Sequence, residues 1–109
     1  MDERWIPARV GDAVTDVDTP ALILDLDRFE GNSARLMSAV QGSGIRVRPH
    51  AKSHKCVEIA RRQLAAGAIG ICCQKTSEAE PFLAGGISDV LISNEVVGDR
   101  KTMKLARLA

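Results

Sequence analysis

Aromatic side chains are scarce in this sequence of 109 residues: Tyr is absent, and Phe and Trp together make up 3%. The hydrophobic core is therefore predicted to be aliphatic, built from Ala, Leu, Ile and Val. Long hydrophobic runs are missing as well, since none approaches the roughly 18 residues that a membrane-spanning helix needs. The first twenty residues are charged and lack the apolar stretch of a secretory signal. These absences predict a cytoplasmic protein that makes no membrane contact.

The chain also lacks an excess of charge of either sign. It has 15 Lys and Arg against 14 Asp and Glu, for a formal net charge of +1. Domains that bind nucleic acid are normally far more basic, so we expect no nucleic-acid partner. Cysteine is limited to Cys56, Cys72 and Cys73, and an odd count with two neighbours does not suit a disulfide framework. We expect reduced thiols, with Cys72 and Cys73 packed as small hydrophobic side chains.

Strand and helix patterns alternate along most of the chain. Residues 1–20 are predicted to be an irregular segment, because prolines and a glycine interrupt it. Residues 21–25 predict a short strand, and apolar positions at helical spacing predict a helix from Asp27 to about Val40. The same patterns predict further strands at 45–48, 68–73 and 89–93, and further helices that begin near residues 56, 76 and 100.

The alternation of strands and helices indicates the fold class. Repeated β/α units form parallel sheets, either doubly wound or closed into a (β/α)8 barrel. A barrel of the TIM type usually needs about 250 residues, and this sequence ends inside its last predicted helix. We therefore expect an α/β fold that represents the amino-terminal part of a barrel, with about three β/α units.

Catalytic residues are expected at the carboxyl ends of the predicted strands, where barrel enzymes carry their active sites. This rule selects residues 48–55, 74–76 and 94–95, and the first of these holds two His, two Lys and one Arg within eight residues. Lys52 stands among these cations, which would lower its pKa and allow a neutral amine to form a Schiff base. The alternative is a solvated basic loop or a patch that binds phosphate.

A metal site within this segment is not predicted. His50 and His54 are four residues apart, which on a helix is a spacing of metal ligands. Pro49 places them in a turn instead, and no acidic third ligand lies nearby.

Four stretches of the sequence carry a family resemblance: DTPALILDLD at 18–27, RPHAKSHKC at 48–56, GICCQK at 70–75 and ISNEVVG at 92–98. Together they resemble the amino-terminal part of the D-threonine aldolase family. That family is related to the D-serine dehydratases and shares the barrel of the alanine racemase N-terminal domain type. The resemblance implies that residues 21–109 form part of this barrel, and that strand 21–25 joins a second, β-rich domain formed by a carboxyl-terminal part that is not in this sequence.

The resemblance also implies an activity. Members of the family are lyases that carry pyridoxal phosphate as an internal aldimine and cleave D-threonine and related D-β-hydroxy-α-amino acids to glycine and an aldehyde. The matching Schiff-base lysine is Lys52, and we expect His50, Arg48 and Gln74 to help bind the cofactor. The family also uses a divalent cation such as Mn2+ or Mg2+, whose ligands lie outside this sequence, and its full-length members are expected to form homodimers.

Two alternatives to the aldolase follow from the same resemblance. A dehydratase acting on D-serine or 3-hydroxyaspartate would use the same Lys52 but eliminate water. A carrier protein built on this barrel would bind pyridoxal phosphate without turning over an amino acid. For a polypeptide limited to these 109 residues we expect no aldolase activity.

Overall fold

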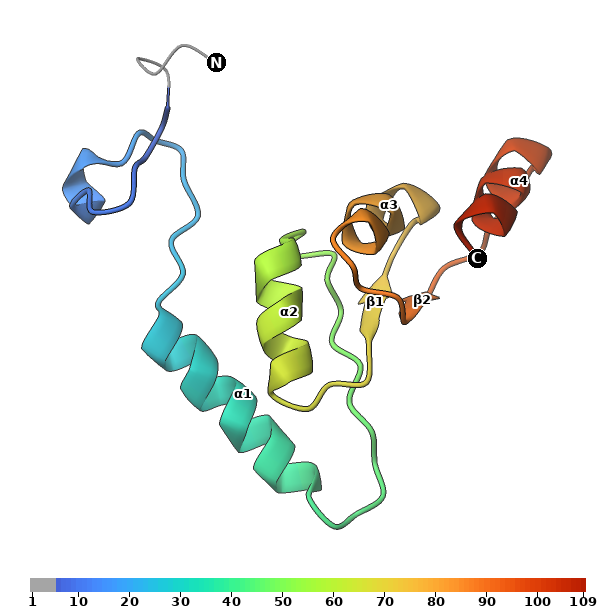
Figure 1. The fold of residues 1–109 in the computed structure, drawn as a ribbon, viewed down its shortest axis with the longest axis horizontal. Coiled ribbons are helices and arrows are strands. Elements are labelled where there is room, and N and C mark those ends of the chain that lie inside the picture. Colours follow the sequence, from blue (N-terminus) through green and yellow to red (C-terminus); the bar gives the residue numbers. More distant parts are fainter. Residues whose placement is uncertain (1–5) are drawn as a thin grey trace.

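The computed structural model describes residues 6–109, so the first five residues of the predicted irregular segment lie outside the described part. The described elements are a short 3-10 helix, four α-helices and two strands, in the order η2 (Val14–Asp16), α1 (Leu26–Val40), α2 (Val57–Ala65), β1 (Ile71–Cys73), α3 (Thr76–Ala84), β2 (Val90–Ile92) and α4 (Asp99–Leu108) (Figure 1). No helix among the described residues is both long and apolar enough to cross a membrane.

β1 and β2 form a parallel pair joined by α3, as the alternating pattern predicts. Ile71 stands opposite Val90 and Cys73 opposite Ile92. All three residues of β1 are buried, which confirms the prediction from its continuous apolar run. The prediction that β2 is buried in the same way is wrong, since Leu91 is 51% exposed. Within the described residues β2 has a strand neighbour on one side alone.

The predicted strand 45–48 does not form. The chain around it runs beside β1 and contributes a single parallel bridge, between His50 and Cys72. Backbone hydrogen bonds run from Ile69 N to Val47 O (3.0 Å) and from Cys72 N to Pro49 O (2.8 Å). Pro49 has no N–H to return, so the ladder is interrupted at its centre.

The predicted strand 21–25 is also absent. Residues 21–25 are irregular, without a strand partner in the described part of the chain, and Leu22 is 92% exposed. A strand requires a neighbour to satisfy its backbone groups, and no described segment supplies one here. That these residues pair with a second domain stays a prediction.

α1 begins where the sequence predicts and lies apart from the strands (Figure 1). Asp25 caps it, because its Oδ1 accepts a hydrogen bond of 3.0 Å from Arg28 N. None of the residues of α1 is buried. An ion pair of 2.9 Å between Glu30 and Arg62 ties α1 to α2.

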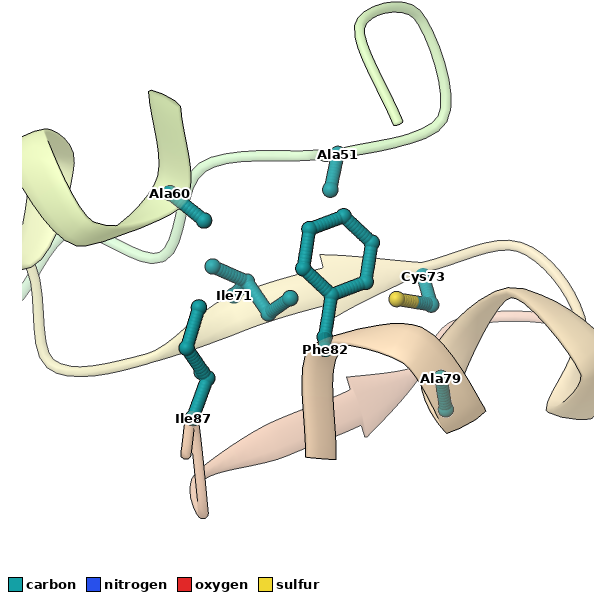
Figure 2. Close-up of a cluster of buried hydrophobic side chains, with 7 residues drawn as sticks. All are labelled: Ala51, Ala60, Ile71, Cys73, Ala79, Phe82 and Ile87. Carbon is teal, nitrogen blue, oxygen red and sulfur yellow. The ribbon is translucent and has the colours of Figure 1, made fainter. Parts of the chain in front are cut away.

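The core is a small cluster that lies between β1, α2 and α3, as Figure 2 shows. Its members are Ala51, Ala60, Ile71, Cys73, Ala79, Phe82 and Ile87. The prediction of a purely aliphatic core is wrong in one respect, because the largest fully buried side chain is Phe82. One aromatic ring fills a space that several small alanines leave open. This cluster fixes β1, and with it the segment that follows Pro49.

Candidate functional site

The turn that carries Lys52, residues 50–55, lies beside the carboxyl end of β1 in space. Ala51 N donates to Cys72 O (2.7 Å), which places the turn against the strand. Lys55 N then donates to Ala51 O (2.9 Å) and closes the turn. Two histidines hold its ends: His50 Nδ1 accepts from Lys52 N (3.2 Å), and His54 Nδ1 accepts from Cys56 N (3.1 Å). Lys52 is thus presented by a turn whose backbone is fixed at four donors.

The two lysines of this turn have different surroundings. Lys55 Nζ lies 3.6 Å from Glu78 Oε1, and the Glu78 side chain is only 12% exposed. Lys52 is exposed, and its side chain makes no hydrogen bond or ion pair with residues 6–109. The amine of Lys52 is therefore free for a reaction partner, whereas that of Lys55 is held by a carboxylate.

His50 connects the turn to both strands. Its Nε2 lies 3.2 Å from Ser93 Oγ, and that hydroxyl also donates to Cys73 O (3.3 Å). Ser93 directly follows β2 and Cys73 ends β1. His50, Ser93 and Lys52 N therefore meet at the carboxyl edge of the parallel pair, where a barrel active site is expected.

Arg48 points to the opposite edge of the sheet. Its guanidinium lies 2.6 Å from Asp89 Oδ1 and 3.2 Å from Asp89 O, and Asp89 precedes β2. This hydrogen bond raises the pKa of Arg48 and lowers the pKa of Asp89. The structure therefore does not bring the Arg48 guanidinium together with His50 and Ser93. Its expected contact with a cofactor finds no support in this geometry.

Gln74 lies at the carboxyl end of β1, on the side of α3. Its backbone N donates to Glu78 Oε2 (2.9 Å), and this bond is the main cause that lowers the pKa of Glu78, with Lys55 adding to it. Gln74 also lines a pocket of about 200 Å³ with Asn94 and Glu95. The second and third stretches selected from the sequence therefore meet in one pocket. Lys52 does not line that pocket.

His54 lies against the hydrophobic core. Its ring meets that of Phe82 edge-on, with 6.3 Å between the ring centres. Burial lowers the pKa of His54, and its Nε2 is buried without a hydrogen-bond partner among the described residues. No group of three or more His, Cys, Asp or Glu side chains in residues 6–109 is arranged to hold a metal ion. In each histidine of the turn, Nδ1 accepts a backbone N–H from the residue two positions later.

The cysteines are free thiols, as the sequence predicts. Cys72 and Cys73 are both buried, which confirms their packing role. Burial raises the pKa of the Cys73 thiol to about 11.

Sequence reasoning missed Ser93, Asp89 and Glu78. Ser93 stands immediately after a predicted strand, so the rule that selected Asn94 and Glu95 would have found it with a boundary one residue earlier. Asp89 and Glu78 find their partners 41 and 23 residues away in sequence, and no local pattern indicates such pairs.

The chain is similar to part of several enzymes whose names refer to D-threonine or 3-hydroxyaspartate. No family model matches it. It is 56% identical over 103 residues to a D-threonine aldolase of Arthrobacter sp., covering 94% of this chain and 27% of that protein. It is 46% identical over 104 residues to a 3-hydroxy-D-aspartate aldolase of Paracoccus denitrificans, again covering 94% and 27%.

Two solved structures are also similar to this chain. The crystal structure of D-threonine aldolase from Filomicrobium marinum matches with a TM-score of 0.89 and 59% identity, over 95% of this chain and 28% of that one. D-threo-3-hydroxyaspartate dehydratase from Delftia sp. HT23 matches with a TM-score of 0.76 and 39% identity, over 84% and 24%. The chain spans about a quarter of the length of the relatives it matches.

Proposed function

Because this chain belongs to the family of D-threonine aldolases and 3-hydroxyaspartate aldolases and dehydratases, we propose that it is part of a pyridoxal-phosphate-dependent lyase. The reaction is the cleavage of D-threonine and related D-β-hydroxy-α-amino acids into glycine and an aldehyde. The observation that carries this proposal is the 56% identity to a D-threonine aldolase, which exceeds the 46% identity to a 3-hydroxy-D-aspartate aldolase.

The fold proposed for the complete protein is a (β/α)8 barrel to which residues 21–109 contribute about three units. Two features support it. β1 and β2 are parallel and joined by a helix, as successive barrel strands are. Val90 and Ile92 pack against the core, so Leu91 points to the opposite face of β2, which parts of the barrel outside this chain would cover.

Lys52 is the residue proposed to hold the cofactor covalently. It is a primary amine at the carboxyl edge of the sheet, exposed and without a partner among the described residues, and these properties fit a carbonyl-bearing cofactor. When bound, pyridoxal phosphate supplies an electron sink for the carbanion that bond cleavage leaves. His50 accepts the backbone N–H of Lys52, and Gln74 and Asn94 both line the pocket of about 200 Å³. The described residues offer no group of three or more His, Cys, Asp or Glu side chains for a divalent cation.

The test compares Lys52→Ala with Lys55→Ala in the complete protein that carries this sequence. After addition of pyridoxal phosphate and borohydride reduction, peptide mass spectrometry locates the cofactor. We expect wild type and Lys55→Ala to be labelled at residue 52, and Lys52→Ala to lose the label and all activity. Label that persists in Lys52→Ala and disappears in Lys55→Ala would move the site to the other lysine.

Product analysis separates the aldolase from the second candidate. The structural match to a D-threo-3-hydroxyaspartate dehydratase is the observation that favours that candidate. With D-threonine, the aldolase releases glycine and acetaldehyde. With D-threo-3-hydroxyaspartate, a dehydratase releases a keto acid and ammonia. Covalent labelling without either pair of products would indicate a carrier of the cofactor.

A further inference from the structure

The hydrogen bonds around His50 determine where its protons lie. His50 Nδ1 faces the backbone N–H of Lys52, which can only donate, so Nδ1 must accept and carries no proton. In a neutral imidazole the proton then resides on Nε2. Nε2–H faces Ser93 Oγ, so the ring donates and the hydroxyl oxygen accepts. The hydroxyl proton remains for Cys73 O, which lies 3.3 Å away.

These bonds form a chain with one direction. It runs from Lys52 N–H to His50, from His50 to Ser93, and from Ser93 to the carbonyl that ends β1. Ser93 N also donates to the same Cys73 O at 2.9 Å, so Ser93 is itself fixed by the sheet. The carboxyl ends of both strands are thereby coupled to the backbone of the residue proposed to carry the cofactor.

From this chain we infer that Ser93 is a positioning residue for Lys52, acting through the Nε2–H tautomer of His50. The inference deepens the proposed function and rests on the role assigned there to Lys52. Ser93 touches neither the Lys52 amine nor any reacting atom. It holds the imidazole in one rotamer and one tautomer, and the imidazole holds the Lys52 N–H.

His54 provides an internal comparison. Its Nδ1 accepts from the backbone N–H two residues later, as that of His50 does, but its buried Nε2 has no partner among the described residues. The local bond from a histidine to the i+2 backbone is therefore a feature of the turn alone. His50 differs from His54 because its Nε2 also contacts the residue after β2, and that contact is with Ser93 Oγ.

The first measurement is made on the wild-type protein, with one variant used only to assign the signals. In the complete protein labelled with 15N-histidine, long-range 1H–15N NMR reports which ring nitrogen carries the proton, and the His50 signals are assigned by their loss in His50→Asn. We expect His50 to be protonated on Nε2 and unprotonated on Nδ1. A proton on Nδ1 would overturn the inference, because that nitrogen then has no acceptor role for Lys52 N–H.

The second measurement is backbone hydrogen exchange at Lys52, with the β1 amide of Ile71 as reference. Removal of one neutral hydrogen bond is expected to speed exchange at Lys52 about five- to tenfold in Ser93→Ala. Exchange at Ile71 should stay unchanged, and Ser93→Thr should restore protection. Ser43→Ala is the matched control, since that hydroxyl also donates to a backbone carbonyl (Val40 O, 2.6 Å) but lies in another loop. Equal exchange at Lys52 in wild type and Ser93→Ala would overturn the inference.

His50→Asn tests the route. An Asn Oδ1 can accept from the N–H two residues on, but it has no group that reaches Ser93. In that background, Ser93→Ala should add no further change at Lys52, and an additive effect would show that Ser93 acts by another path. The NMR and the hydrogen-exchange measurements are both made on the apo-protein, so neither depends on bound cofactor. If Lys52→Ala retained covalent cofactor while the exchange results stood, the proposed function would fail and the hydrogen-bond chain would survive.

Discussion

Two lysines that are three residues apart differ in whether a carboxylate pairs with them. Glu78, at the start of α3, lies 3.6 Å from the Lys55 amine. The Lys55 ammonium is thus held by a carboxylate, whereas no described residue pairs with the Lys52 amine. The assignment of Lys52 as the reactive residue therefore depends on a long-range contact as well as on the turn itself.

Cys73 offers a test of burial at the residue scale. Its side chain is fully buried and its pKa is raised to about 11, so at pH 8 only about one thiol in a thousand is ionised. We expect iodoacetamide to modify the partly exposed Cys56 in the folded protein and to leave Cys73 unmodified. Both should react in denaturant. Rapid labelling of Cys73 in the native state, located by peptide mass spectrometry, would show that β1 is not packed as described.

The Arg48–Asp89 pair predicts a change in ionisation. The guanidinium lowers the pKa of Asp89 chiefly through their hydrogen bond. Arg48→Ala should therefore move the pKa of Asp89 up toward its ordinary value near 3.8, as followed by carboxyl NMR during acid titration. The control is Arg28→Ala, which removes an exposed pair with Asp25 and should leave Asp89 unchanged. An unaltered Asp89 in Arg48→Ala would contradict the contact.

At the scale of elements, Glu78 anchors the beginning of α3. Lys75, the residue before the helix, makes no side-chain capping bond, and Glu78 instead accepts from Gln74 N. Glu78→Gln should lower the free energy of unfolding by about 1 kcal/mol at neutral pH. Because the folded-state pKa of Glu78 is lowered, this contribution is present above the ordinary value near 4.5 and is lost as the pH falls through the folded-state value.

The matched control for Glu78 lies on the same helix. Glu80 pairs with Lys104 at 2.8 Å, and both side chains are more than a third exposed. Glu80→Gln should therefore change the stability by only a few tenths of a kcal/mol. Urea unfolding of the complete protein between pH 3 and 7 measures both variants. Equal losses for the two variants would refute a capping role for Glu78.

Substitution by Ala is expected to have opposite effects on stability at two glycines. A Cβ at Gly70 would overlap the Arg48 guanidinium and the Asp89 carbonyl oxygen, so Gly70→Ala should destabilise the protein by about 2 kcal/mol or more. Gly31 lies inside α1 with open space around it, and Gly31→Ala should stabilise by about 0.5–1 kcal/mol. Thermal unfolding of both variants checks the pair, and a Gly70→Ala variant as stable as wild type would contradict the close approach at Gly70.

The elements that the sequence predicted well are those whose signals are local. Helical spacing predicted α1 within one residue of its observed start, and the apolar run before Gln74 predicted β1. The segment around Arg48 failed as a strand because Pro49 has no N–H to donate, which interrupts the ladder beside β1. In the site, Lys52 was selected from its cluster of cations. The direction of Arg48 was not predictable, since its partner Asp89 is 41 residues away.

At the scale of the whole molecule, the described chain is open. Its Cα radius of gyration is 16.8 Å, against about 13 Å for a compact domain of this length. Seven residues form the core, three of them alanines, and the described sheet has two strands. Leu22, Ile23 and Leu91 leave apolar surface exposed at two separate places. Such a chain buries too little apolar area to offset its conformational entropy by itself.

We therefore expect a polypeptide limited to these 109 residues to behave differently from the complete protein. It should bind the dye ANS, unfold over a broad temperature range and release no glycine from D-threonine when given pyridoxal phosphate and a divalent metal. The reason is physical, because the exposed faces of β2 and residues 21–25 need partners to exclude water. The complete protein serves as the control and should unfold cooperatively with little dye binding. A sharp, dye-free thermal transition of the 109-residue polypeptide would show that its small core is sufficient, and glycine release would place the whole reaction within it.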